Sequence, residues 1–304
     1  MAKDDDTLKP AATNGIHDPN KVASLAATIK EKEKHTVRSF NPTDGTDDFL
    51  GKPPLQVLRN LYGNIKFGSI RFPGSSQPPA KYLHVPLESE QALCETGTRA
   101  LLALFTSTWN LAPPSAIISV MGRMGADGEP LFVDPKVAPK LRRALKGAAE
   151  RSNAWVFTNG VRGSSGVVEL VGRALERSSA PLIGFAPWSL VDEREEMQGG
   201  GQIHFYKTGK SVNAPASYAA SVGTIDDDKP SAEASLDPSH DFFLLIDDGS
   251  AEHSRHANDT TAAFRSAFRN YISDNDVSND GIKTPTLSLV FNGGPMVLRQ
   301  LLTS

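Results

Sequence analysis

From residue 115 onwards, short apolar runs alternate with longer stretches whose apolar residues recur at helical spacing. Each apolar run has the length of a buried strand, and four of the five runs end in Gly, Asn or Asp. A chain that repeats strand and helix in this way forms parallel βαβ units, with helices on both faces of one sheet. We therefore expect an α/β fold built on a Rossmann-like, doubly wound parallel sheet.

The expected elements follow from this alternation. The strands are expected at 115–122, 155–160, 181–187, 242–250 and 284–294. The helices are expected at 134–153, 164–178, 258–273 and from 295 onwards. In the first helix, Asp134 is the expected N-cap and Pro135 the first helical residue. Residues 198–239 are rich in Gly, Ser and Asp, so we expect an excursion loop with one strand-like piece at 203–206.

The chain divides into three regions. Residues 1–37 are polar and end near a run of charges, which predicts a flexible N-terminal arm. Residues 38–113 contain aromatic and β-branched runs within 57–85, which predict a small β element, and a helical pattern over 88–109. We expect this α+β lead-in to pack on the core of a nucleotide-binding domain that spans 114–304.

Composition excludes several classes of protein. The chain has 32 Lys and Arg against 35 Asp and Glu, a net charge of -3, so a surface dedicated to nucleic acid is not expected. Cys94 is the one cysteine, which excludes an internal disulfide framework and suits a reducing compartment. The sequence has no apolar run of membrane-spanning length, and its acidic start does not resemble a secretory signal. We expect a soluble, intracellular segment without direct membrane insertion.

The loops after the expected strands carry the candidate binding residues. Carboxyl ends of parallel strands meet at one edge of a sheet, where helix N-termini present unpaired N–H groups. Each glycine there either ends a strand tightly or lets the backbone approach a phosphate, and several such loops together favour a phosphate-bearing ligand. The loops are 121–125, 159–166, 186–195, 247–250 and 292–295. Their candidate ligand-binding residues are Gly122, Arg123, Asn159, Gly160, Ser164, Ser165, Gly166, Trp188, Arg194, Asp247, Gly249, Gly293 and Gly294.

Standard phosphate-binding motifs are absent from these loops. The sequence contains no G-x-x-x-x-G-K-[ST] and no clean G-x-G-x-x-G that opens the first helix. An ordinary P-loop NTPase or Rossmann dehydrogenase is therefore not expected.

Arginines are stronger candidates than histidines for holding such a ligand. Guanidinium groups form forked hydrogen bonds to diphosphates and stack on adenine, whereas the alternative for each arginine is a surface salt bridge. Arg265 is the sharpest case, because its helix neighbours Phe264 and Phe268 are expected to be buried. The arginines expected on or near the ligand edge are Arg123, Arg162, Arg194 and Arg265.

Two acidic residues and one tryptophan near this edge have open roles. Asp247 and Asp248 form a pair at a strand end, where they either bind ribose hydroxyls, perform acid–base chemistry or cap the next turn. Trp188 either offers a stacking face to a base or packs in the core.

The histidines predict no metal site. His253 and His256 have loose metal-ligand spacing, but no carboxylate or thiol set completes them, so we expect a solvated loop. His240, just before an apolar strand, is expected to make structural hydrogen bonds.

Seven stretches of the chain occur in an order that identifies a family. They are FGSIRFPGSSQPPAKYLHVPLES, SAIISVMG, KLRRALKGAAERSNAWVFTNG, GVVELVGRAL, PLIGFAPWSLVDERE, LDPSHDFFLLIDDGS and TLSLVFNGGP. Together they resemble the N-terminal SLOG-type domain, or melastatin homology region, of melastatin-type transient receptor potential channels. The resemblance covers roughly residues 60–295.

This resemblance implies a function and a set of ligand positions. It implies a cytosolic, Rossmann-like sensor domain of a tetrameric, calcium-permeable cation channel, with the remaining channel domains as partners. In the branch gated by ADP-ribose, the region binds ADP-ribose or a close relative at the strand ends. The family's ligand positions then fall on Gly122, Arg123, Ser164, Ser165, Gly166, Arg194 and Arg265. The turn at Trp188 is similar to the family's PWG turn, with Ser189 in place of Gly.

The wider SLOG superfamily also includes nucleotide phosphoribohydrolases, which use the motif PGGxGTxxE. The nearest stretch here, 292–300, lacks the Gly-Thr and has Gln300 where the Glu would stand. Glutamine cannot take up a proton at neutral pH, so we expect ligand binding without turnover and no cofactor beyond the bound nucleotide. The alternative, a nucleotide N-glycosidase, stays open through the Asp247–Asp248 pair.

Overall fold

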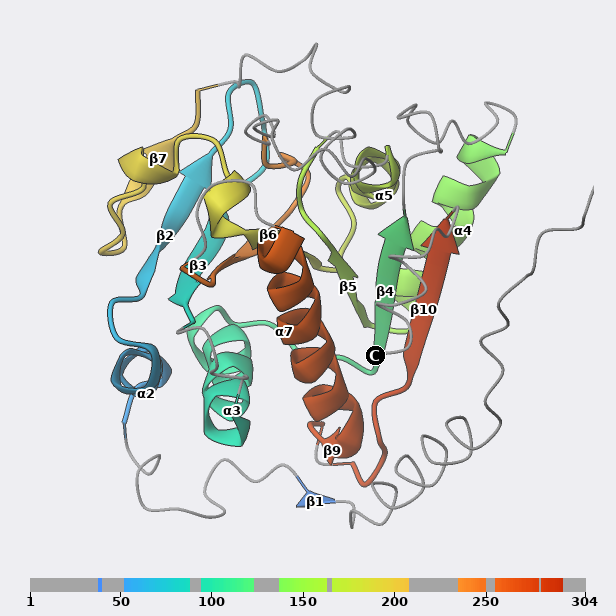
Figure 1. Cartoon of the computed structure of the whole chain (residues 1–304). Coiled ribbons are helices and arrows are strands. Elements are labelled where there is room, and N and C mark those ends of the chain that lie inside the picture. The colour runs from blue at the N-terminus through green and yellow to red at the C-terminus, as the bar shows by residue number, and fades with distance from the viewer. Residues whose placement is uncertain are drawn as a thin grey trace, which may run out of the picture. The chain divides into compact units, whose positions relative to one another are not determined.

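An eight-stranded sheet with the order β10-β4-β5-β6-β8-β3-β2-β7 organises the chain (Figure 1). The computed structural model describes residues 38–39, 52–87, 94–122, 137–162, 166–207, 235–249, 255–278 and 280–291. The strands of this sheet are β2 (Lys66–Arg71), β3 (Ala80–Pro86), β4 (Ala116–Gly122), β5 (Ala154–Thr158), β6 (Leu182–Pro187), β7 (Ile203–Phe205), β8 (Phe242–Asp247) and β10 (Thr286–Phe291). A separate two-stranded pair joins β1 (Arg38–Ser39) to β9 (Asn275–Asp276).

The sheet is mostly parallel. The pair β2–β3 is antiparallel, and every other neighbouring pair of the eight-stranded sheet is parallel. The helices are α2 (Pro54–Tyr62), α3 (Glu95–Ala103), α4 (Ala138–Arg151), α5 (Val167–Leu175) and α7 (Arg255–Asp274). Helices α2, α3 and α7 cover one face, and α4 and α5 cover the other (Figure 1). The predicted α/β, Rossmann-like fold is therefore confirmed.

Alternation along β5 shows how the two faces are filled. Trp155 and Phe157 pack in the same cluster as Phe268 of α7. Val156, between them, packs in the cluster that contains Val171 of α5. Successive side chains of a strand point to opposite faces, so an unbroken apolar run serves both layers at once.

A third apolar cluster lies over β3, β6 and β8 on the face that carries α4 and α5. It includes Trp188 from the 3-10 turn η2 (Trp188–Leu190), together with Tyr206 and Leu236. The latter two lie at the described ends of the predicted excursion loop, and an isolated bridge joins Leu236 to Val161. The cluster therefore packs against the sheet through turns and loop ends, directly beside the carboxyl ends of β6 and β8.

The prediction of a β element over the whole of 57–85 is wrong at its start. Pro54 begins α2, which runs to Tyr62 and ends at Gly63. Leu55 and Leu58 recur at helical spacing, and Leu58 is fully buried, which is the pattern of an amphipathic helix. The later part of the run forms β2 and β3 as predicted.

Helix boundaries also differ from the prediction. Helix α4 begins at Ala138, with Val137 before it and Pro139 in its first turn, so the predicted start at Pro135 is wrong. Helix α3 is followed by a π-helical turn, Leu104–Thr108, before the chain turns toward β4. The predicted arm 1–37, the predicted cap Asp134 and the helix predicted from 295 lie outside the described residues.

The predicted lead-in contributes strands to the same sheet as the core. Strand β3 lies between β8 and β2, and its register with β8 pairs Pro86 with Asp247 at one end. The chain from Arg38 to Ser304 forms one compact unit. In the part of the chain that the structure describes, every helix is too short or too polar to cross a lipid bilayer.

Candidate functional site

The described candidate residues gather mainly at the carboxyl ends of adjacent parallel strands. These ends form one edge of the sheet because β4, β5, β6 and β8 are neighbours and run in the same direction. The residues at or just beyond them are Gly122, Asn159, Gly160, Trp188, Asp247 and Gly249. We call this region the carboxyl edge.

Two glycines bring the backbones of neighbouring strands into contact at this edge. A Cβ atom on Gly160 would lie 2.9 Å from the Cα of Gly184, and one on Gly184 would lie 2.7 Å from the Cα of Gly160. Gly160 also has a φ of 69°, and its N–H donates to the hydroxyl of Thr158 at 3.0 Å. Because backbone cannot move aside, only glycine fits at these two positions.

The end of β4 approaches the start of α5 just as closely. A Cβ atom on Gly122 would lie 2.5 Å from Cγ2 of Val167, the first residue of α5. Gly166 precedes it as the N-cap with a φ of 67° and offers no capping side chain. Both glycines let the helix N-terminus lie against the strand end, where helix dipoles favour anions.

A histidine and an aspartate pair across β3 and β8. Nε2 of His84 donates to Oδ2 of Asp247 at 3.1 Å, while Oδ1 accepts the N–H of Gly249 at 3.0 Å. The pKa of Asp247 lies below its ordinary value, mainly because of the hydrogen bond from His84. The N–H of Gly249 and the charges of His84 and Arg194 lower it further. Both carboxylate oxygens of Asp247 accept hydrogen bonds. Of the roles predicted for Asp247, the structure shows the capping of the turn that follows β8.

The neighbouring Asp248 also has a structural contact. Its Oδ2 accepts a hydrogen bond from Thr260 at 3.2 Å, which ties the end of β8 to helix α7.

Trp188 packs beside the His84–Asp247 pair. Its ring centroid lies 4.3 Å from that of His84, and the Lys66 ammonium lies 5.2 Å from the centroid of a Trp188 ring. The residue is 8% exposed, which fits the predicted core-packing alternative. Nη1 of Arg194 donates to the carbonyl of Ser189 at 2.6 Å, next to Trp188. We call His84, Trp188, Arg194 and Asp247 the edge cluster.

Arg162 forms the salt bridge that was its alternative role. Its Nε lies 3.3 Å from Oδ2 of Asp237, whose side chain is almost fully buried. Burial raises the pKa of Asp237, but His240, the N–H of Ser239 and Arg162 together keep it below its ordinary value. Ring nitrogens of His240 hydrogen bond to Thr158 and to the carbonyl of Asp237. The predicted structural role of His240 is confirmed.

Arg265 is a buried cation on α7. It is 7% exposed, and within the described part of the chain it has no ion pair or hydrogen bond. Its pKa is lowered to about 10, mainly by burial and to a smaller extent by the charge of Arg269 one turn later. Arg265 therefore stays charged at neutral pH. A buried charge without a partner is costly, so this position is suited to receive an anion.

Arg265 and the edge cluster belong to opposite faces of the sheet. Helix α7 packs in the cluster of Phe268, whereas Trp188 belongs to the cluster on the other face. Helix α7 begins at the carboxyl edge (Figure 1). Side chains of a helix lean toward its N-terminus. A ligand that used both Arg194 and Arg265 would therefore have to cross this edge.

Several predicted positions lie outside the described residues. These are Arg123, Ser164, Ser165, Gly293 and Gly294, together with His253 and Gln300. The side chain of His256 is likewise outside the description. Among the residues that are described, no three His, Cys, Asp or Glu side chains group closely enough to hold a metal ion.

His84 and Lys66 were not predicted as part of the site. His84 lies in the run KYLHV, which predicted only a strand. A useful signal was present, because His84 alternates with Tyr82 on one face of an otherwise apolar strand. The partner Asp247 lies 163 positions away, so the spacing of residues could not reveal the pair.

Comparison with known proteins gives one family and several channel relatives. The family model described as "SLOG in TRPM" matches residues 80–304. A Caenorhabditis elegans "Transient receptor potential channel" is 29% identical over 245 residues, which cover 78% of this chain and 10% of that protein. A Nematostella vectensis "Transient receptor potential cation channel subfamily M member-like 2" is 26% identical over 276 residues, which cover 88% of this chain and 16% of that protein.

A rat relative gives the same result. "Transient receptor potential cation channel subfamily M member 2" of Rattus norvegicus is 28% identical over 246 residues, which cover 77% of this chain and 14% of the relative. The chain thus spans between 10% and 16% of the length of the relatives that it matches here.

Proposed function

The chain belongs to the family of SLOG domains in TRPM channels, and on this basis we propose that it is a non-catalytic sensor domain of a cation channel. It binds ADP-ribose or a related adenine nucleotide diphosphate at the carboxyl edge of the sheet. It acts in the cytosol as part of a tetrameric, calcium-permeable channel, with the remaining channel domains as its partners.

The observation that carries this proposal is the guanidinium of Arg265, which forms no ion pair or hydrogen bond among the described residues. This side chain is buried on α7, the helix that begins at the carboxyl edge, and Arg269 adds a second positive charge one turn later. A diphosphate would neutralise this buried charge and accept forked hydrogen bonds from it. The close glycine contacts at Gly122 and Gly160 support the proposal, because they keep backbone and helix N-termini near the same edge.

Helix α7 also supplies a route from ligand to channel. It packs against β6, β8 and α3, so a change in its position would shift the packing of the elements on one face of the sheet. A ligand shifts a conformational equilibrium only through a difference in affinity between the two states. Neutralising Arg265 provides such a difference, because it favours the state in which α7 is packed over the bound anion.

Isothermal titration calorimetry of the 304-residue chain with ADP-ribose tests this proposal. We expect R265M to weaken binding by about 1.5–3 kcal/mol, the worth of a charge-assisted contact. The same variant should raise the free energy of unfolding of the unliganded chain by about 1 kcal/mol, because it removes an unneutralised buried charge. R265K should bind with intermediate affinity, since it keeps the charge and loses the fork.

R151Q is the matched control, because Arg151 is an exposed arginine on α4 and the variant removes the same charge. Its affinity for ADP-ribose should equal that of the wild type. Unchanged affinity in R265M would remove Arg265 from the site, and no heat for ADP-ribose in the wild type would overturn the proposal.

The nucleotide N-glycosidase remains the second candidate. The His84–Asp247 hydrogen bond favours it, because such a pair at a strand end can carry acid–base chemistry. Incubation with AMP or ADP-ribose, followed by chromatography for released base, separates the two functions. We expect intact nucleotide; released adenine that disappears in D247N would establish the enzyme.

A further inference from the structure

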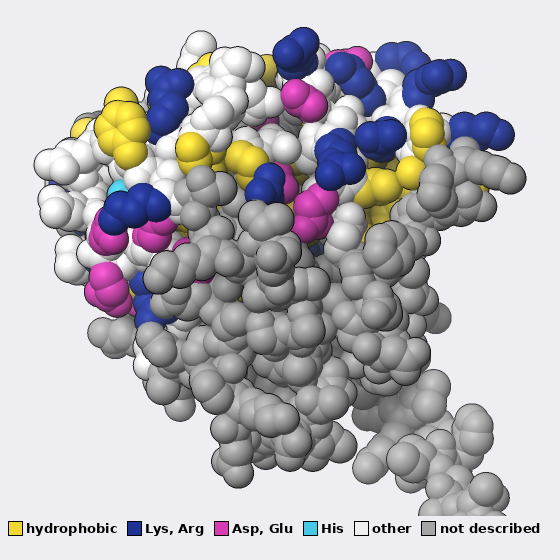
Figure 2. Space-filling model, turned by 90° about the horizontal axis from the view of Figure 1, so that it is seen from above, with side chains coloured by type: hydrophobic (Ala, Val, Ile, Leu, Met, Phe, Trp, Pro, Cys, Tyr) yellow, Lys and Arg dark blue, Asp and Glu magenta, His cyan; other side chains and the backbone are white. Residues whose placement is uncertain are grey.

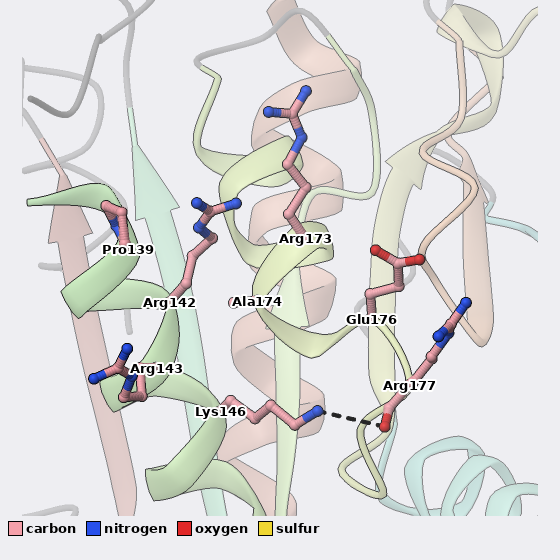
Figure 3. Close-up of a pocket in the computed structure, with 8 residues that line it drawn as sticks. All are labelled: Pro139, Arg142, Arg143, Lys146, Arg173, Ala174, Glu176 and Arg177. Atoms are coloured by element: carbon pink, nitrogen blue, oxygen red, sulfur yellow. Dashed lines mark hydrogen bonds between the residues drawn. The ribbon is translucent and has the colours of Figure 1, made fainter. Parts of the chain in front are cut away.

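A hollow of about 540 Å³ lies between α4 and α5, outside the region of the edge cluster. Figure 3 shows the side chains that line it, with Arg142 of α4 and Arg173 of α5 extending in the same direction from facing helices. The lining residues are Pro139, Arg142, Arg143, Lys146, Arg173, Ala174, Glu176 and Arg177. We call this hollow the α4–α5 groove.

The groove concentrates positive charge in a chain whose net charge is negative. Its lining has five basic side chains and one carboxylate, whereas the whole chain carries a net charge of -3. Figure 2, which views the molecule from above, shows Lys and Arg side chains grouped on the side where α4 and α5 lie. The field in such a hollow attracts anions and raises their local concentration.

Among the described residues, Lys146 is the one basic side chain of the lining that contacts a polar partner. Its Nζ lies 3.8 Å from Oε1 of Glu150 and 3.5 Å from the carbonyl oxygen of Arg177. The four guanidinium groups of the lining form no ion pair or hydrogen bond within the described residues. Their donors are therefore available to a ligand.

Two of these basic residues are placed in ways that oppose local stability. Arg142 and Lys146 are like charges at i and i+4 on α4, a spacing that destabilises a helix. Arg177 has a φ of 57°, in the left-handed region that glycine tolerates best. Residues that lower local stability are expected at positions that serve binding.

Four of the five basic side chains are arginines, which indicates the chemistry of the ligand. A guanidinium presents a planar fork that matches phosphate oxygens, whereas an ammonium acts as a point charge. The hollow is wide open to solvent, so a ligand would be held by charge contacts at its surface and not enclosed. Because most of these side chains are exposed and screened by salt, single contacts are weak and a useful ligand must make several.

We propose that the α4–α5 groove binds a small soluble ligand that carries several phosphate groups. The ligand bridges α4 and α5, with Arg142 and Arg173 as its central contacts and the remaining basic residues around them. Because both helices pack on the same apolar cluster against β4 and β5, a bridging ligand also stabilises this layer of the domain. The proposal is independent of nucleotide binding at the carboxyl edge.

Calorimetric titration of the 304-residue chain with inositol hexakisphosphate tests the groove. We expect binding that weakens when salt is raised, and no measurable heat for inorganic phosphate at the same concentration. R142Q/R173Q should lower the affinity at least about tenfold, because two forked contacts are lost. E176Q should raise it about twofold, because the one carboxylate of the lining is removed.

K140Q/R151Q is the control, since it removes the same charge from exposed positions of α4 outside the groove. Its affinity should stay within about twofold of the wild type. Equal losses in the two double variants would overturn the site in favour of diffuse attraction. Binding to vesicles that contain phosphoinositide, without binding of the soluble probe, would overturn the soluble ligand. ADP-ribose should not displace the probe, and thermal unfolding of each variant checks that the fold is intact.

Discussion

The carboxyl edge and the α4–α5 groove hold charged side chains in opposite ways. At the edge, His84 is buried, its ring packs against that of Trp188 at a tilt of 46°, and both oxygens of Asp247 accept hydrogen bonds. In the groove, Arg143 and Arg173 are exposed and no ion pair within the described residues holds them. The edge is therefore defined by shape and close contact, and the groove by charge. Substitutions at the edge should change stability, whereas those in the groove should mainly change binding.

The largest effect is expected where two backbones touch. G184V places a side chain into the contact with Gly160, and its Cβ would also lie 3.1 Å from side-chain atoms of His240 and Phe243. We expect the free energy of unfolding to fall by about 3 kcal/mol, the cost of overpacking against atoms that cannot move aside. Urea unfolding followed by circular dichroism measures it. A loss below about 1 kcal/mol would mean that the edge is as adaptable as the groove.

The sequence predicts the core of the fold because its signal is local. Strands β4, β5, β6, β8 and β10 are each a separate apolar run. Arg265 stands between two phenylalanines at helical spacing, so its burial was predictable. The position of β3 between β8 and β2 was not predictable, because it depends on pairing between distant segments.

Two parts of the surface described above could not be predicted, for a similar reason. Glycines at strand ends were correctly placed at the carboxyl edge, since a strand end is visible in the sequence. The His84–Asp247 bond and the groove depend on contacts between elements, namely β3 with β8 and α4 with α5. The basic residues of the groove do have a local signal, because Arg142 and Lys146 are one helical turn apart, but α5 completes the hollow.

A smaller effect is expected when the His84–Asp247 pair is broken. H84L removes the donor to Asp247, and we expect it to cost about 1 kcal/mol of stability at pH 7. The lowered pKa of Asp247 contributes stability that is present above its unfolded value of about 3.9 and is lost as pH falls through the folded value. The difference between wild type and H84L should therefore shrink as pH falls below about 4.

Urea unfolding at pH values from about 3.5 to 7 measures this difference, since the unfolded pKa of aspartate, about 3.9, lies within that range. H84Q is the control, because glutamine keeps an N–H donor and should retain more of the pair's contribution. A difference that stays constant over this range would show that His84 acts through packing on Trp188 instead of through the carboxylate.

The smallest effect, with the opposite sign, is expected in helix α4, which forms one wall of the groove. G147A adds a Cβ inside α4 at 2.9 Å from Nη1 of Arg151, the far end of a flexible side chain that can move aside. Alanine is the better helix former, so we expect a gain of about 0.5–1 kcal/mol in urea unfolding, with affinity for inositol hexakisphosphate unchanged. A glycine replacement would thus destabilise the edge but stabilise the helix that flanks the groove. A loss of stability, or a change in affinity, would mean that α4 needs its glycine and that the groove is defined by shape as well as by charge.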